Sequence, residues 1–229
     1  MKAVIVAGGK GTRLRPLTND RPKPMVEVAG KPIVEWQIAW MKGCGIRSFL
    51  IIGSHMFKVL QEYVGDGSRW GVNVEYLNEG PPLGTGGALY AAKELLKNET
   101  DFFMVNGDTI TNFDIRKAER EEYLATIVLF PFRSPYGIVH LEGDRIVKFD
   151  EKPLIEGYWV NGGIYYMKKE IFDYLPKKGD VSFDTFPKVA ADGKLGSVKA
   201  DTYVKFIDAL KDVDEANADV ESGILKFPQ

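Results

Sequence analysis

Short apolar runs that alternate with helical segments constrain the first half of this chain more than any other feature. Four runs are typical of strands, three of them continuous enough for a parallel sheet covered on both faces: Lys2–Ala7, Ser48–Ile52, Asp101–Val105 and the alternating Val72–Leu77. Segments with helical periodicity lie between these runs at Ile33–Met41, Phe57–Val64 and Thr85–Leu96. Because strand–helix–strand units cross over right-handedly, this order predicts an α/β fold with a mostly parallel sheet flanked by helices.

The second half is richer in strands and predicts a smaller mixed sheet. Strand patterns cover Ala125–Phe130, Gly137–Leu141, Arg145–Phe149, Trp159–Met167 and Gly196–Phe206, the second and third forming a hairpin. Short helices are expected at Lys169–Leu175, Asp184–Ala191 and Val213–Val220. Neither a low-complexity linker nor a repeat divides the chain, so residues 1–229 are expected to form one domain, with halves at 1–110 and 111–229.

Charge and cysteine content exclude several classes of protein. The 30 Lys and Arg residues and the 32 Asp and Glu residues give a net charge of −2 at pH 7, whereas a generic nucleic-acid binder is basic. The one cysteine, Cys44, rules out an internal disulfide and fits a reducing compartment. The sequence shows neither a signal-peptide pattern nor an apolar run of membrane-spanning length, so the cytoplasm is the expected location.

The glycine-rich stretch AGGKGTRLRP, residues 7–16, follows the first apolar run and indicates a phosphate site. Backbone amides beside glycines form a concavity for anions, and cationic side chains add charge. The cations within 14 positions are Lys10, Arg13, Arg15, Arg21 and Lys23. The stretch is not a P-loop, since no GxxxxGK followed by Ser or Thr occurs, and Leu14 stands where the dinucleotide fingerprint requires its third glycine.

Two neighbouring motifs, Gly8-Gly9-Lys10-Gly11-Thr12-Arg13-Leu14 and Arg21-Pro22-Lys23-Pro24-Met25, together resemble the signature of the sugar-1-phosphate nucleotidyltransferases. Four later motifs of that family follow in its order: PLGTGGA (82–88), NGD (106–108), EKP (151–153) and VNGGIY (160–165). The resemblance implies a Rossmann-like fold with a smaller sugar-binding lobe. It also implies a reaction between two small molecules, in which a nucleoside triphosphate and a sugar-1-phosphate give a nucleotide-sugar and pyrophosphate. Neither nucleic acid nor membrane is an expected partner.

The resemblance assigns the nucleotide to the first half of the chain. The residues expected to bind it are Ala7, Gly8, Gly9, Gly11, Thr12, Arg13, Lys23, Gly84, Thr85 and Asn106. Arg13 is expected to grip the departing pyrophosphate through its forked guanidinium, and Lys23 to neutralise charge at the α-phosphate. Because a sugar phosphate is already ionised, the reaction depends on positioning and electrostatics more than on a general base. Arg13, Lys23 and Asp108 are therefore the expected catalytic residues.

Mg²⁺ is the cofactor that the resemblance implies, because this ion binds one or two carboxylates together with phosphate oxygens. Asp108 follows an expected strand, at the sheet edge where α/β folds bind ligands. Asp208 is the candidate for a second carboxylate ligand, in a segment that lacks the family's glycine. On the sequence alone, Asp208 fits equally well as the residue that opens the final helix.

The sugar-phosphate site is expected in the second half, with Gly137 giving close approach, Glu151 and Asn161 binding hydroxyls and Lys152 binding the phosphate. The PLGTGGA and VNGGIY motifs resemble those of guanylyltransferases for mannose-1-phosphate or a manno-heptose-1-phosphate, so GTP is the expected nucleotide. Thymidylyl or uridylyl transfer to glucose-1-phosphate is the alternative within the family. A catalytically silent nucleotide-sugar-binding subunit and a dinucleotide-dependent oxidoreductase are the alternatives from other classes.

The hexapeptide repeat of a left-handed β-helix, which follows the catalytic domain in many family members, does not occur in the sequence. A C-terminal β-helix domain is therefore not expected. The sequence leaves the assembly open, and a homo-oligomer is compatible with it.

Overall fold

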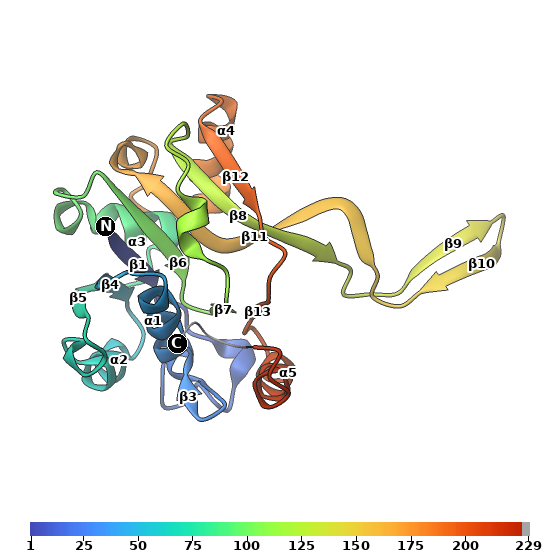
Figure 1. Cartoon of the computed structure of the whole chain (residues 1–229), viewed down its shortest axis with the longest axis horizontal. Helices are drawn as coiled ribbons and strands as arrows, with labels where there is room; N and C mark the ends of the chain where they lie inside the picture. The colour runs from blue at the N-terminus through green and yellow to red at the C-terminus, as the bar shows by residue number, and fades with distance from the viewer. Residues whose placement is uncertain (226–229) are drawn as a thin grey trace.

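A seven-stranded sheet forms the centre of the molecule (Figure 1). The computed structural model describes residues 1–225. In spatial order, the strands are β12 (Leu195–Lys199), β8 (Ala125–Arg133), β11 (Leu154–Lys168), β6 (Asp101–Asn106), β1 (Lys2–Val6), β4 (Ser48–Gly53) and β5 (Asn73–Asn78). All neighbours pair in parallel except β11, which is antiparallel to β6 and β8. The two halves of the chain therefore share one sheet, and the expected mostly parallel architecture is confirmed.

Helices cover both faces of this sheet, as the strand–helix order predicted (Figure 1). The four that do so are α1 (Ile33–Gly43), α2 (Phe57–Val64), α3 (Gly84–Ala91) and α4 (Phe186–Ala191). The first two share a core cluster with Ile5 of β1, and the last two share another cluster with Val4 of the same strand. Successive residues of a strand point to opposite faces, so a strand covered on both sides must be apolar throughout.

Smaller elements close the side of the sheet near the N-terminal loop. They are β2 (Glu27–Val28), β3 (Lys31–Pro32), β7 (Thr109–Thr111), β13 (Val204–Phe206) and α5 (Leu210–Glu221). β13 pairs antiparallel with β7, which directly follows the turn after β6. A third core cluster joins Leu14 of the loop to Ile110 and Ile207. The segment that contains Ile207 is thereby anchored beside the N-terminal loop.

A two-stranded ribbon, β9 (Ile138–Glu142) with β10 (Arg145–Asp150), projects from the ends of β8 and β11 (Figure 1). It confirms the hairpin expected from the sequence, and it pairs with no other strand of the described chain. No helix within residues 1–225 combines the length and apolarity needed to cross a membrane.

Several boundaries differ from the sequence expectations. α3 ends at Ala91, and residues 93–95 form a separate 3₁₀ turn instead of continuing the helix. The expected helix Lys169–Leu175 is also a 3₁₀ turn, Lys169–Asp173. β11 begins at Leu154, five residues earlier than expected, because it pairs there with Arg133 of β8. Each difference reflects tertiary pairing or a short segment in which periodicity is a weak signal.

Candidate active site

A cleft of about 280 Å³ opens at the carboxyl ends of β1 and β6. These strands run side by side, with Val6 opposite Asn106. The chain passes from β1 to β4 on one side of β1 and later returns to β6 on its other side, so the strand order reverses here. Open α/β sheets bind their ligands at such a point.

Seven of the ten residues expected to bind the nucleotide line this cleft: Ala7, Gly8, Gly9, Lys23, Gly84, Thr85 and Asn106. Gly11, Thr12 and Arg13 are not among its walls. Gly11 has a positive φ of 61°, and a Cβ there would stand 3.1 Å from the Lys23 Cβ. A side chain at Gly11 would therefore strain the backbone and displace Lys23, so this glycine positions the lysine.

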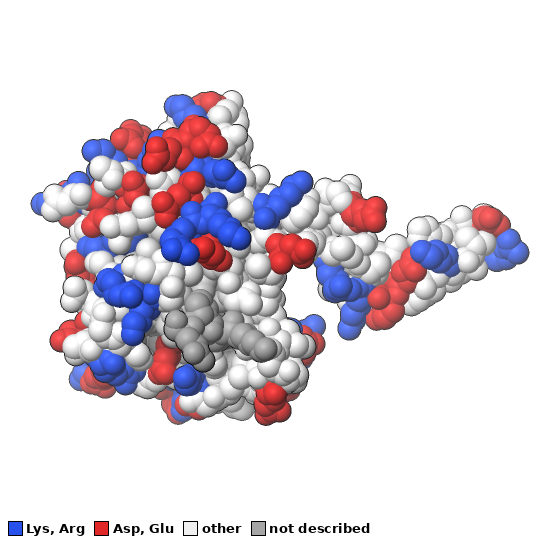
Figure 2. Space-filling model, viewed as in Figure 1, with Lys and Arg blue, Asp and Glu red and all other residues white. Residues whose placement is uncertain are grey.

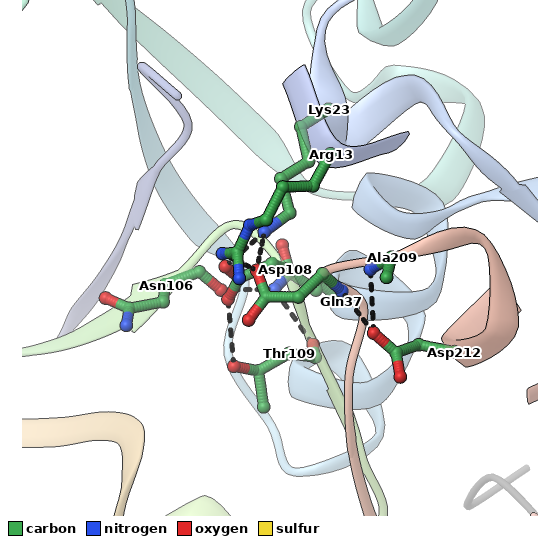
Figure 3. A network of polar contacts seen from close by, with 9 residues as sticks. Arg13, Lys23, Gln37, Asn106, Asp108, Thr109, Ala209 and Asp212 are labelled. Carbon is green, nitrogen blue, oxygen red and sulfur yellow. Dashed lines mark hydrogen bonds and ion pairs between the residues drawn. The ribbon is translucent and has the colours of Figure 1, made fainter. Parts of the chain in front are cut away.

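Two cations and two carboxylates meet beside the cleft (Figure 3). The Lys23 Nζ donates to Asp108 Oδ2 and to Asp208 Oδ1, at 2.7 Å in both cases. Arg13 Nη2 donates to the same Asp208 oxygen at 3.0 Å, and its side chain is 72% exposed. The Lys23 side chain is only 13% exposed. The fold therefore brings all the expected catalytic and metal-binding residues into one network, with Lys23 inside it and Arg13 at its solvent side.

The structure decides between the two sequence interpretations of Asp208. The carboxylate that caps α5 belongs to Asp212, whose Oδ2 accepts hydrogen bonds from the N–H groups of Asp208 and Ala209 at 2.9 and 2.7 Å. The Asp208 side chain instead faces Lys23. The capping interpretation of Asp208 is wrong, because a later residue of the segment supplies that carboxylate.

Gln37 is a residue of this site that the sequence analysis missed. It lies on α1 without exposed surface, and its Nε2 donates to the carbonyls of Asn106 and Thr109 at 2.7 and 3.0 Å (Figure 3). These carbonyls bracket Asp108, so the amide holds the turn that presents this carboxylate. A glutamine inside the apolar helical segment Ile33–Met41 was the available signal, because a buried amide requires partners.

Replacing this glutamine, Gln37→Leu, is expected to lower both stability and turnover. Two buried carbonyls would lose their donor, which costs about 2–4 kcal/mol and lowers Tm by roughly 5 °C or more. Any activity that depends on the Asp108 carboxylate should also fall several-fold, because Asp108 is no longer held in place. Gln61→Leu on α2, remote from the cleft, is the control. A lower Tm with unchanged activity would show that Gln37 only supports the fold.

Glu79, which follows β5, was not among the expected site residues. Its side chain lines the cleft, and its Oε2 accepts a hydrogen bond from the Leu83 N–H at 3.1 Å. Burial raises the pKa of this carboxyl above its ordinary value. A Cβ on Gly8 would stand 2.1 Å from Glu79 Oε1, so the glycine leaves room for the carboxylate. A lone acidic residue between a strand and the PLGTGGA motif was the signal in the sequence.

Thr85 and Gly84 join the cleft to the second half of the chain. The Thr85 N–H and hydroxyl both donate to Asp180 Oδ1 at 3.1 Å, and the hydroxyl accepts from the Val181 N–H at 3.0 Å. Gly84 has a φ of 78°, and a Cβ there would stand 2.5 Å from the Gly179 carbonyl oxygen. The Thr85 hydroxyl is thus engaged within the protein, a role that the sequence did not indicate.

A second cavity, of about 560 Å³, lies beside the first and shares Asn106 and Asp108 with it. Asn161 of β11, one of the residues expected to bind the sugar, lines this cavity. Its Nδ2 donates to the Tyr165 hydroxyl at 2.9 Å, which orients the amide. The two cavities therefore meet at Asn106 and Asp108.

The other residues expected to bind the sugar phosphate lie at the base of the β9–β10 ribbon. Gly137, Glu151 and Lys152 line neither cavity. A Cβ on Gly137 would stand 2.9 Å from Glu151 Oε2, so these two residues are neighbours. Lys152 has a positive φ of 47°, and its carbonyl accepts a hydrogen bond from Arg133 Nη1 at 3.1 Å. Arg133 itself lines the second cavity and is a cation that the sequence analysis missed.

The family described as Nucleotidyl transferase matches residues 2–213 of this sequence. The chain belongs to that family. This nucleotidyl transferase is 34% identical over 189 residues to the D-glycero-α-D-manno-heptose 1-phosphate guanylyltransferase of Campylobacter jejuni. The aligned region covers 81% of this chain and 84% of that protein. It is also 34% identical to the mannose-1-phosphate guanyltransferase of Yarrowia lipolytica, over 89% of this chain but only 59% of that longer protein. The resemblance read from the motifs is confirmed.

Other relatives extend this comparison. The UTP–glucose-1-phosphate uridylyltransferase of a Synechocystis strain is 34% identical to the nucleotidyl transferase, over 84% of this chain and 56% of that protein. The crystal structure of HddC from Yersinia pseudotuberculosis complexed with GMP-PN aligns with a TM-score of 0.76 at 26% identity, covering 96% of this chain and 99% of that chain. The chain is therefore an enzyme of the nucleotidyl transferase class, and identity alone does not distinguish guanylyl from uridylyl transfer.

Proposed function

We propose that this nucleotidyl transferase moves a guanylyl group from GTP to a sugar-1-phosphate and releases pyrophosphate. The observation that carries the guanine preference is the place of Glu79. It follows β5, and its carboxylate lies beside Gly8, whereas Asp108 follows β6, three positions from β5 in the sheet. Lys23 and Asp108 mark the phosphate end of the cleft, so Glu79 lies at the end that remains for the base.

An ionised carboxylate matches guanine better than it matches the other bases. Guanine presents N1–H and N2–H as adjacent donors, one for each oxygen. Thymine and uracil present one N–H between two carbonyls, so an oxygen of Glu79 would face a carbonyl. Adenine presents a single donor beside an acceptor nitrogen. Each hydrogen bond to a charged group contributes about 1.5–3 kcal/mol, enough to discriminate between nucleotides.

The carboxylates of Asp108 and Asp208 fit Mg²⁺, because oxygens from both already converge on one cation, the Lys23 ammonium, at 2.7 Å. They would hold the ion, which when bound neutralises charge on phosphate oxygens. Lys23 would then face the α-phosphate from inside the cleft. Arg13, at the solvent side of the network, would bind the departing pyrophosphate.

The proposed reaction needs positioning and charge neutralisation rather than a general base. A phosphate oxygen of the sugar-1-phosphate attacks the α-phosphorus in line. The bond from that phosphorus to the oxygen bridging to the β-phosphate breaks, and its electron pair leaves with pyrophosphate. Asn161 would bind a sugar hydroxyl in the second cavity, while Arg133 would attract the sugar phosphate. The guanylyltransferase relatives support a mannose- or manno-heptose-like sugar.

Pyrophosphate release across a grid of substrates tests this function. GTP, ATP, UTP and dTTP are each paired with mannose-1-phosphate, a manno-heptose-1-phosphate and glucose-1-phosphate in the presence of Mg²⁺. Turnover is expected to be highest with GTP and a manno-configured sugar. Turnover with UTP or dTTP alone would replace the guanine assignment by the pyrimidine alternative. No turnover with any pair would favour the silent nucleotide-sugar-binding subunit. The structure argues against that alternative, because Arg13, Lys23 and Asp108 belong to one network of polar contacts.

A further inference from the structure

A turn from the second half of the chain holds the start of α3. The first N–H groups of an α-helix lack partners within the helix. In α3, the Thr85 N–H donates to Asp180 Oδ1 at 3.1 Å. The N–H groups of Gly86 and Gly87 donate to the Gly179 carbonyl at 2.9 and 3.1 Å. Asp180 and its neighbour therefore cap a helix that lies 95 positions away in the chain.

This cap occupies a common position for phosphate. Helix starts bind anions through their free N–H groups and their dipole. In α3 these groups are engaged within the protein, and the Asp180 carboxylate takes the place of an anion. Asp180, Gly84 and Thr85 also line the cleft. This end of the cleft therefore suits an uncharged part of a ligand, such as a base or a ribose, better than it suits a phosphate.

Hydrogen bonds connect the same turn to Glu79. The Gly179 N–H donates to the Leu83 carbonyl at 2.8 Å, and the Leu83 N–H donates to Glu79 Oε2 at 3.1 Å. Leu83 thus lies between the turn and the carboxylate. A displacement of the turn relative to α3 would therefore displace the Glu79 side chain as well.

Asp180 is the residue at which these contacts converge. Its Oδ1 also accepts a hydrogen bond from the Thr85 hydroxyl at 3.1 Å, and that hydroxyl accepts one from the Val181 N–H at 3.0 Å. On the other side, the Asp180 N–H donates to Asp184 Oδ2 at 2.8 Å, and the Asp184 N–H donates to the Asp180 carbonyl at 2.8 Å. Asp180 is thereby fixed by its own turn while it holds Thr85.

The glycines of the PLGTGGA motif let the turn approach α3 closely. A Cβ on Gly86 would stand 3.1 Å from the Gly179 carbonyl oxygen, and a Cβ on Gly87 would stand 2.9 Å from the Lys177 carbonyl oxygen. Larger residues at these two positions would push the turn away from the helix. The motif therefore shapes the contact with residues 177–180 as well as the wall of the cleft.

Broad electrostatic attraction does not replace such local contacts. Figure 2 shows Lys and Arg side chains interspersed with Asp and Glu side chains over this face of the molecule. A field of one sign would draw in an anionic ligand from a distance. With mixed charges, the affinity for a nucleotide depends on the groups that line the cleft and on the residues that hold them.

We propose that Asp180 is a positioning residue for the nucleotide, which acts through Thr85 and Leu83 to hold the base end of the cleft in shape. This role rests on the proposed function, since it takes the ligand of the cleft to be a nucleotide. In the described chain, the hydrogen bonds of Asp180 go to Thr85 and to its own turn. None of them joins it to Lys23 or Asp108, so Asp180 affects nucleotide binding and not the chemical step.

Isothermal titration calorimetry with the α,β-methylene analogue of GTP, in the presence of Mg²⁺, tests this role. The analogue cannot be cleaved between its α- and β-phosphates, so binding is measured without turnover. Asp180→Ala is expected to raise the Kd about tenfold, because two hydrogen bonds to a charged acceptor are lost. Asp180→Asn keeps an acceptor oxygen and should stay within about threefold of the wild-type Kd. Asp173→Ala, at an exposed position that lines neither cavity, is the control and should leave the Kd unchanged.

Steady-state kinetics separates positioning from support of the fold. Asp180→Ala should raise KM for GTP about tenfold, and it should change kcat and the KM for the sugar-1-phosphate by less than about twofold. An unchanged Kd in this variant, with or without a lower Tm, would overturn the proposal. A Kd in Asp180→Asn as high as in Asp180→Ala would also overturn it, because the charge and not the acceptor would then matter.

A double-mutant cycle with Thr85→Val tests whether Asp180 acts through Thr85. This variant keeps the N–H that donates to Asp180, so α3 keeps its backbone cap, and it should raise the Kd about threefold or more. Together with Asp180→Ala, it should weaken binding no further than Asp180→Ala alone. Independent, multiplying effects would overturn the proposal. If Asp180→Ala does not fold, an unchanged Kd in Thr85→Val alone would do so.

The same titrations distinguish this role from the proposed function. Binding of the analogue without any turnover would contradict the proposed transfer and leave the test of Asp180 intact. Binding of the α,β-methylene analogue of UTP alone would overturn the guanine assignment, and the variants would then be compared on that analogue. A wild-type chain that binds neither analogue would overturn both.

Discussion

Asp108→Asn is expected to reduce turnover by about 10³-fold, or ~4 kcal/mol of transition-state stabilisation, while the chain stays folded. The substitution keeps the shape of the side chain but removes a negative charge from the point where the two cavities meet. Lys23 would retain Asp208 as a partner at 2.7 Å, so the loss of stability should stay near 1 kcal/mol. The measurements are kcat for pyrophosphate release, the Mg²⁺ concentration for half-maximal rate, and Tm.

The matched control is Asp114→Asn. Asp114 pairs with Arg116 at 2.8 Å and lines neither cavity, so turnover should be unchanged. Asp208→Asn separates the roles of the two carboxylates. If both hold the ion, each substitution raises the Mg²⁺ requirement; if Asp208 only orders Lys23 and Arg13, its substitution changes kcat alone. Full Mg²⁺-dependent activity in Asp108→Asn would remove this residue from the metal site.

Glu79→Gln is expected to reverse the nucleotide preference, lowering kcat/KM for GTP by about 10²-fold, or roughly 3 kcal/mol. An amide offers one acceptor and one donor, which suits the adjacent N–H and carbonyl of uracil or thymine instead of the two donors of guanine. The glutamine can still accept the hydrogen bond from Leu83, so the loop should keep its structure. Turnover with UTP or dTTP should rise relative to GTP.

The control for this substitution is Glu62→Gln, which alters an exposed ion pair with Lys58 on α2. It should leave the preference among nucleotides unchanged. If Glu79→Gln lowered turnover with all nucleotides to the same extent, the carboxylate would support the cleft without reading the base, and the guanine assignment would lose its basis.

The raised pKa of Glu79 leads to two further predictions, one on stability and one on GTP binding. Burial raises the pKa of this carboxyl in the folded state above its value in the unfolded state. Between these two pKa values the native state binds more protons than the unfolded state. The free energy of unfolding therefore falls as pH rises through that interval. Glu79→Gln removes this penalty and should not lower Tm at neutral pH. Guanine binding requires the ionised carboxylate, so KM for GTP should rise on acidification, beginning at a higher pH than an ordinary glutamate would give.

Much of the fold could be read from local patterns. The runs 2–7, 48–52 and 101–105 had to be strands covered on both faces, because a continuous apolar run leaves no side for water. The helices Ile33–Met41 and Phe57–Val64 followed from their periodicity and agree closely with α1 and α2. The 3₁₀ turns Thr12–Leu14 and Lys23–Met25 were not foreseen, since three residues carry no periodic signal.

The candidate site could be predicted only in part from the sequence. The glycine loop, the motif Arg21-Pro22-Lys23-Pro24-Met25 and the NGD motif pointed to Gly8, Gly9, Lys23 and Asp108 through their resemblance to the family's motifs. Gln37 and Glu79 were missed, since the signal that each offered, an isolated polar residue beside an apolar segment, does not reveal which distant groups it contacts. The partners of Gln37 lie 69 and 72 positions away in the chain.

The sequence by itself determined the α/β class and the family, and it predicted a phosphate site at the N-terminal loop, because these inferences depend on residue types at short spacing. Only the tertiary structure decided that Asp208 joins Lys23 across 185 positions and that Glu79 faces the cleft. The order and register of the strands bring these residues together. The sequence around each residue does not indicate which distant residue it will contact.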